Sequence, residues 1–153
     1  DFSEASREAL RYAIVLAERL DAHIEVLHVW EPSPYVSPAA LVWLQGEAQS
    51  FWAHVERDLA ERLRAWVAEV AGPEMPRIST RVEAGYTSQA ILRAAEQGPF
   101  DLVVMGTHGR AGLSHLLLGS VAQRVARLAP CPVLTVRAQR PDRESSRGAP
   151  RVA

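Results

Sequence analysis

The stretch DLVVMGTHGRAGLSHLLLGS, residues 101–120, joins an apolar run to a loop with widely spaced glycines. Residues 102–105 are Leu, Val, Val and Met without interruption, which is typical of a strand buried in a parallel sheet. The apolar run ends at Gly106, and further glycines follow at positions 109, 112 and 119. Ser120 comes directly after the last of them and is a candidate N-terminal cap. The stretch therefore predicts a strand, a glycine-containing loop and a helix that begins near Ser120.

Helix and strand patterns alternate along the rest of the chain. Apolar residues recur every three or four positions in the segments for which we expect helices, namely 3–20, about 38–70, 87–97 and 120–128. Alternating or wholly apolar runs predict strands over 23–30, 77–84, 101–106 and 131–137. Strands that alternate with helices need crossover connections, so this order predicts an α/β fold with a parallel sheet.

The length and composition fit one globular domain followed by a polar tail. The chain has 153 residues, of which 48% are hydrophobic and 23% are charged, as is ordinary for a domain with a sizeable core. Residues 138–153 are rich in Arg, Ser and Pro and show no periodicity. We therefore expect one folded domain over 1–137 and a disordered C-terminal tail over 138–153.

The overall charge and several missing features exclude some functions. A net charge of -1 gives no reason to expect a nucleic acid or an anionic membrane as partner. No apolar run approaches the roughly 18 residues that span a bilayer. The chain has no lysine, which excludes a Schiff base and the usual P-loop. Its one cysteine, Cys131, cannot form an internal disulfide and favours a cytoplasmic location.

The glycines suggest a backbone shaped around an anionic ligand. Gly106 stands at the carboxyl end of a predicted strand, where open parallel sheets bind ligands. The helix expected from Ser120 would present free N–H groups to a phosphate at the same edge. On spacing alone, a turn glycine, a loop glycine and an ordinary helix start explain the pattern equally well. His108 and His115 have no third ligand nearby, so we expect no metal site, and no residue is assigned as catalytic.

The arrangement Gly106-x2-Gly109-x9-Gly119-Ser120, followed by Val121, resembles the ATP-binding signature of the universal stress protein family. Three other segments resemble landmarks of the same family, namely DFSEAS at 1–6, LHVW at 27–30 and APCPVLTVR at 129–137. The resemblance covers residues 1–137 and implies that they form a nucleotide-binding domain.

This resemblance implies a particular sheet and a particular dimer. The family fold is an open, parallel, five-stranded α/β sheet of order 3-2-1-4-5 with helices on both faces. Its first strand ends just before the position of Asp1, so we expect that strand to come from residues upstream of Asp1 or from another chain. The resemblance also implies a homodimer through the last strand, 131–137, which would pair across a two-fold axis.

The resemblance further implies a site for ATP, with Mg²⁺ held through the phosphates. Asp1 would bind the ribose, the Val29 backbone would meet the adenine, and Met105 would lie near the base. The residues implied around the ribose and phosphates are Gly106, Gly109, Gly119, Ser120 and Val121. Arg110 is a further candidate phosphate contact, for which a solvated loop position is the alternative.

The function that follows is an ATP-binding stress-response or signalling protein. No carboxylate or histidine is placed by sequence beside the expected γ-phosphate, so we expect the nucleotide to be bound and not rapidly consumed. Two alternatives stay open. One is a slow ATPase or adenylyl transferase on the same site, and the other is a nucleotide-free dimeric adaptor.

Overall fold

The computed structural model describes residues 1–44, 47–72, 77–107 and 118–138. The helices are α1 (Glu4–Leu20), α2 (Phe51–Ala71), α3 (Thr87–Gln97) and α4 (Ser120–Leu128). The strands are β1 (Ile24–Trp30), β2 (Leu41–Leu44), β3 (Glu47–Ser50), β4 (Ile78–Ala84), β5 (Val103–Gly106) and β6 (Val133–Val136). The predicted helices at 3–20, 87–97 and 120–128 and all four predicted strands are confirmed to within about three residues. The predicted tail lies almost wholly outside the described residues.

The helix predicted over about 38–70 is wrong in its first part. β2 and β3 form an antiparallel hairpin there, with Leu41 paired to Ser50 and Leu44 to Glu47, and α2 begins only afterwards. β2 consists of Leu, Val, Trp and Leu, a short apolar run of the kind that favours a strand. Gly46 would also cost a helix interior about 1 kcal/mol, which adds to the preference for the hairpin.

Two pairs of parallel strands form the centre of the molecule. β1 pairs with β4 from Ile24↔Ile78 to Trp30↔Ala84, and β5 pairs with β6 from Val103↔Val133 to Gly106↔Val136. Both pairs agree with neighbours in the expected order, namely strands 2 and 3 and strands 4 and 5. Within the described residues β1 and β5 are not hydrogen-bonded to each other, so the structure does not establish a five-stranded sheet.

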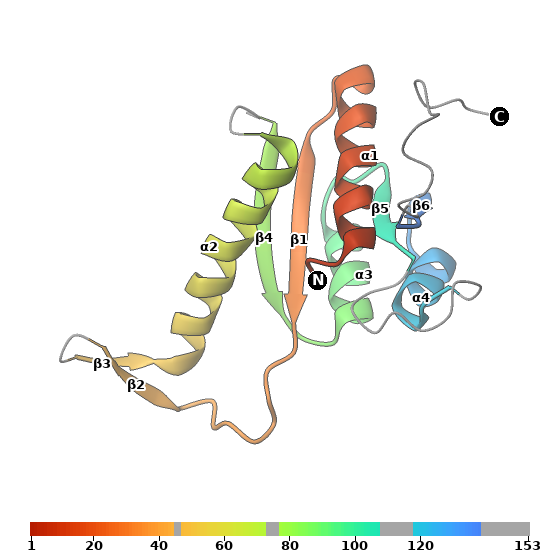
Figure 1. The fold of residues 1–153 in the computed structure, drawn as a ribbon. Helices are drawn as coiled ribbons and strands as arrows, with labels where there is room; N and C mark the ends of the chain where they lie inside the picture. Colours follow the sequence, from red (N-terminus) through yellow and green to blue (C-terminus); the bar gives the residue numbers. More distant parts are fainter. Residues whose placement is uncertain (45–46, 73–76, 108–117, 139–153) are drawn as a thin grey trace.

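Helices lie on both sides of the β1–β4 pair. Figure 1 shows α2 crossing in front of β4, α1 running between β1 and β5, and α3 to the right of β1, partly behind α1. The main core joins α1 and α2 through buried Leu10, Leu63 and Val67. Partly buried side chains from β1 and β4 complete this core, among them Val26 and Val82. Among the described residues, no helix has the length and apolar character needed to cross a membrane.

The region around α3 and α4 is built from small side chains. The buried residues there are Ala90, Ala94, Ala95, Ala122, Val125 and Val136. α3 and α4 contact each other directly. Alanine lets two helix backbones approach closely, so this region packs with little side-chain volume.

The first turn of α1 packs directly against the end of β5. A Cβ atom added to Gly106 would lie 2.8 Å from the Ala5 Cβ and 3.0 Å from the Ala5 carbonyl carbon. Ala5 is only 6% exposed and is therefore enclosed by its neighbours, so the α1 backbone cannot easily move away from an added Cβ. Gly106 is therefore required by the packing of α1 in addition to any part that it plays toward a ligand.

We expect Gly106→Ala to lower the free energy of unfolding by about 1–3 kcal/mol, because the new methyl group overlaps the α1 backbone. Denaturant unfolding of the ligand-free protein measures this change. Gly98→Ala is the matched control, because the three atoms nearest to its Cβ, all within 3.1 Å, belong to the side-chain ring of Phe100, which can turn aside where the α1 backbone cannot. Equal stability of Gly106→Ala and the parent protein would contradict the packing described here.

Candidate functional site

The N-terminal residues are held on the first turn of α1. Ser3 caps the helix, and its side-chain oxygen accepts a hydrogen bond from the Ser6 N–H at 3.2 Å. The Asp1 carboxylate accepts hydrogen bonds from the Ser3 N–H at 3.1 Å and from the Ser6 hydroxyl. An acidic group at a helix N-terminus is also favoured by the helix dipole. These contacts fix Asp1 beside the end of β1.

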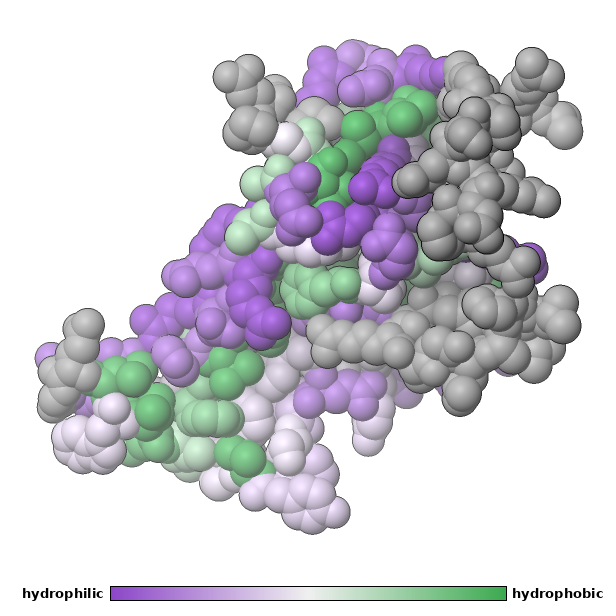
Figure 2. Space-filling model, in the orientation of Figure 1, coloured by the Kyte–Doolittle hydropathy of each residue, from purple (hydrophilic) through white to green (hydrophobic). Residues whose placement is uncertain are grey.

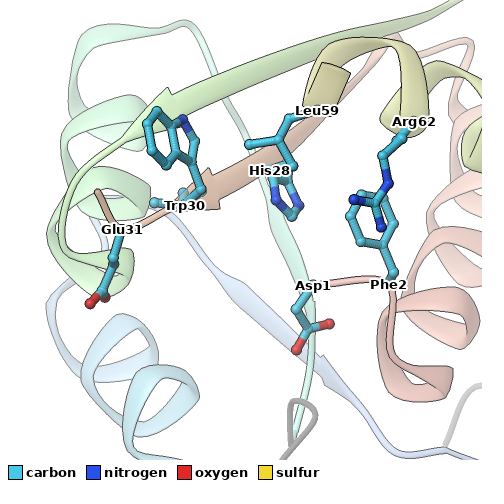
Figure 3. A pocket seen from close by; sticks show the side chains of 8 residues that line it. Asp1, Phe2, His28, Trp30, Glu31, Leu59 and Arg62 are labelled. Atoms are coloured by element: carbon cyan, nitrogen blue, oxygen red, sulfur yellow. The ribbon is translucent and has the colours of Figure 1, made fainter. Parts of the chain in front are cut away.

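A pocket of about 360 Å³ opens between the start of the chain, the end of β1 and the middle of α2. Figure 3 shows it from close by, with Arg62 reaching from α2 toward Phe2 and His28 pointing in from β1. The lining residues are Asp1, Phe2, His28, Val29, Trp30, Glu31, Leu59 and Arg62. The volume falls at the lower end of the range for small-ligand sites, roughly 300–1,000 Å³.

Phe2 has an unusual backbone conformation that turns its ring inward. Its φ is 59°, in the left-handed region that non-glycine residues rarely adopt. The ring stacks on His28 with a centroid separation of 4.6 Å and meets Trp66 edge-on at 5.7 Å. The Arg62 guanidinium lies 5.9 Å from the Phe2 ring centroid. Aromatic and cation–π contacts thus compensate the cost of the conformation, roughly 1–2 kcal/mol.

Trp30, the last residue of β1, and Glu31, which follows it, continue the pocket wall, and their side chains point to opposite sides in Figure 3. The Trp30 ring lies 5.4 Å from the Trp52 ring. The Glu31 carboxylate accepts hydrogen bonds from the N–H and the hydroxyl of Thr87, each at 3.2 Å. Tyr86, at the N-cap of α3, makes no side-chain cap bond. Glu31 therefore caps α3 and ties the end of β1 to that helix.

The described residues on either side of the glycine-containing segment, Thr107 and Gly119, meet at the end of β5. The Thr107 N–H donates to the Val136 carbonyl at 2.8 Å, and the Gly119 N–H donates to the Thr107 carbonyl at 2.8 Å. α4 therefore begins beside the strand end. The expectation that Ser120 caps α4 is wrong, because Gly119 is the N-cap and Ser120 is the first helical residue. Gly119 has extended backbone and makes no side-chain cap bond, so within the described part of the chain it leaves N–H groups of the first turn uncapped.

The structure brings the expected site residues to two neighbouring places. Asp1 and Val29 line the pocket. Met105 and Gly106 end β5, and the hydrogen bond between Thr107 and Gly119 places the start of α4, with Ser120 and Val121, beside them. The first turn of α1 touches both places, through Asp1 on one side and Ala5 on the other. Gly109 and Arg110 lie outside the described residues.

Sequence reasoning did not find most of the pocket wall. Phe2, His28, Trp30, Glu31, Leu59 and Arg62 were not expected at the site. Leu59 belongs to the apolar repeat of α2, and Arg62 follows three residues later, so helical spacing places both near one face. The signal that could have indicated this wall is the presence of aromatic rings next in sequence to Asp1 and Val29, at Phe2, His28 and Trp30. Among the described residues, no group of three or more His, Cys, Asp or Glu side chains could hold a metal ion.

The sequence pattern of the universal stress protein family matches residues 1–137. The chain belongs to the universal stress protein family. A relative from Methanocaldococcus jannaschii is 36% identical over 137 residues, which are 90% of this chain and 78% of the relative. A relative from Thermus aquaticus is 35% identical over 138 residues, covering 90% and 93% of the two chains. A Mycolicibacterium smegmatis relative is 36% identical, and the chain spans 43% of its length.

Solved structures of this family share the fold. The universal stress protein UspA from Lactobacillus plantarum is 27% identical, with a TM-score of 0.62 and coverage of 90% of this chain and 92% of its own. A universal stress protein in complex with cAMP has a TM-score of 0.59, 21% identity and coverage of 91% and 92%. An Arabidopsis thaliana family member with AMP bound has a TM-score of 0.53, 20% identity and coverage of 95% and 88%. The α/β universal stress protein fold of this chain is thereby established.

Proposed function

We propose that this universal stress protein binds ATP, with the base and ribose in the pocket and the phosphates at the start of α4. The observation that carries the proposal is that Asp1 and Val29, 28 positions apart in sequence, line one pocket. The resemblance assigns them to the ribose and the adenine, respectively. The bound nucleotide then serves a stress-response or signalling role.

The pocket has the chemistry that suits a purine base. The rings of Phe2, His28 and Trp30 give it flat, polarisable walls, and each ring on which a base stacks adds about 1–3 kcal/mol in nucleic-acid complexes. Val29, the next-to-last residue of β1, lies beside them, and its backbone can offer polar atoms to the edge of the base. The Asp1 carboxylate is an acceptor of the kind that binds ribose hydroxyls.

The start of α4 suits the phosphates. This chain has no lysine with which to hold them, so backbone N–H groups and the positive end of a helix dipole are the natural substitutes. α4 begins within one hydrogen bond of β5, and its N-cap is a glycine whose backbone a ligand can approach closely. Mg²⁺ would then be bound mainly through phosphate oxygens. The cAMP and AMP complexes of structural relatives support an adenine nucleotide as the ligand class.

We expect Gly109→Val to weaken ATP binding at least tenfold, about 1.4 kcal/mol, because its side chain would obstruct a backbone cradle. Isothermal titration calorimetry measures the affinity, and chromatography of the recovered nucleotide reports any hydrolysis. Gly98→Ala is the control that should bind ATP as the parent does. Gly98 is the C-cap of α3 and lies shortly before β5 begins, whereas the proposed site lies where β5 ends. Absence of ATP, AMP and cAMP binding by the folded parent, or unchanged ATP affinity of folded Gly109→Val, would contradict the proposal.

We also propose a homodimer through β6. Among the described strands, β6 pairs only with β5, so its other edge is open. It contains Val, Leu, Thr and Val and no charged residue, and Leu134 is 36% exposed. An uncharged open edge favours pairing with another strand. The family resemblance indicates that the partner is the same strand of a second copy.

We expect Leu134→Lys to raise the dissociation constant of this dimer at least tenfold, because each subunit would bring a charge into the paired edge. Sedimentation equilibrium measures the constant, and Leu128→Lys on α4, also exposed, is the control that should leave it unchanged. A parent protein that stays monomeric at tens of micromolar would count against dimerisation through β6.

A further inference from the structure

The hairpin of β2 and β3 projects away from the rest of the molecule. Figure 1 shows it at the N-terminal end of α2, well beyond the ends of β1 and β4. Figure 2 shows hydrophobic residues gathered over the same projection. An isolated two-stranded hairpin is marginal in water, because it lacks a third strand or a packed face. A further strand paired with this hairpin would therefore stabilise it, and its projecting position leaves space for one.

One face of the hairpin is apolar and open to solvent. Leu41 is 64% exposed and Trp43 is 73% exposed, whereas Val42 and Leu44 between and after them are half-buried. In the hairpin register, Trp43 stands opposite Ala48 and Leu41 opposite Ser50. None of these four residues is charged, so the exposed face has no group that resists burial.

The outer edge of β2 has backbone groups that point away from β3. The Ala40 carbonyl accepts a hydrogen bond from the Phe51 N–H at 2.9 Å, so the backbone of position 40 points toward β3. Antiparallel pairing alternates, and positions 42 and 44 therefore also point toward β3. The N–H and C=O groups of Leu41 and Trp43 therefore point outward, and among the described strands β2 pairs only with β3. β2 also contains no Pro or charge, the usual protections of an edge strand.

We propose that this edge pairs with β2 of a second copy of the chain, antiparallel about a two-fold axis through Val42. The outward-pointing positions determine this register, because Leu41 then faces Trp43 of the second copy and Trp43 faces its Leu41. These two pairs exchange about four backbone hydrogen bonds. The result is a four-stranded sheet in the order β3-β2-β2-β3, with two leucine–tryptophan pairs on one face.

A second copy fits this edge better than an unrelated partner. A two-fold interface must be complementary to itself, and an uncharged strand meets this condition because it places no like charges opposite each other. The charged residue of the hairpin, Glu47, lies on β3 and so stands away from the axis. Four residues per edge make a small contact, in the class of transient interfaces below about 1,200 Å². The hairpin dimer should therefore increase with protein concentration.

Disulfide trapping tests the register. The two Val42 residues would form a non-hydrogen-bonded pair with Cα atoms about 4.5 Å apart, which suits a disulfide. In a Cys131→Ser background, Val42→Cys should form a covalent dimer under mild oxidation at least tenfold faster than Gln49→Cys. Gln49 is the matched control because it pairs with Val42 within the hairpin and is also half-buried, but lies on the strand away from the axis. Equal trapping rates for the two variants would overturn the proposal.

A charge variant separates this contact from a β6 dimer. Trp43→Lys should slow trapping of Val42→Cys at least tenfold, whereas Leu20→Lys, at a similarly exposed position on α1, should not change it. Leu134→Lys should also leave the rate unchanged, since β6 is a different edge. Unchanged trapping in Trp43→Lys would overturn the proposal. A second pair of results would also overturn it. If Val42→Cys is trapped only weakly, and the parent but not Trp43→Lys floats with phosphatidylcholine–phosphatidylglycerol vesicles, then a membrane is the partner.

Discussion

The contact between the first turn of α1 and the end of β5 is the constraint on which the arrangement of this molecule depends. Within the described residues, no hydrogen bond joins the β1–β4 pair to the β5–β6 pair. α1 contacts β5 at Gly106, and through Leu10 and its neighbours it enters the core that β1 and β4 complete. A helix is thus the direct link between the two strand pairs. Because Gly106 has no side chain, that helix can approach the strand backbone closely.

The same turn of α1 gives the proposed nucleotide site its two parts. Asp1 is held on this turn and lines the pocket at the end of β1, while Ala5 touches the strand that leads to the glycine-containing segment. A ligand that bridges the pocket and the start of α4 would contact elements from both strand pairs. We therefore expect ATP to stabilise their relative position by mass action, in proportion to its saturation.

Local patterns predicted the elements well, because their signals lie within a few residues. Ser3 before an apolar repeat marked the start of α1, and Gly72 marked the end of α2 with a positive φ of 86°. The hairpin was missed because the apolar residues of β2 also fit the spacing of the long helix that follows. Gly46 was the contrary signal.

The site was predicted only in part, because some of its residues carry a signal in the sequence and others are brought in by tertiary contacts. Resemblance to the family pointed to Asp1 and Val29, and the structure places both in one pocket. The pocket wall from α2 was not predictable, because the packing of Leu59 and Arg62 on Phe2 and β1 depends on tertiary contacts. The capping of α3 by Glu31 is likewise a contact across 56 positions of sequence.

Amide hydrogen exchange with and without saturating ATP tests the central claim, that the first turn of α1 joins the two parts of one nucleotide site. The account predicts slower exchange at residues 3–7, at residues 29–31 and at the start of α4, each by at least tenfold, with no change in β2 and β3. Protection at residues 29–31 alone, with unchanged exchange at residues 3–7 in protein that calorimetry shows to be saturated, would contradict it.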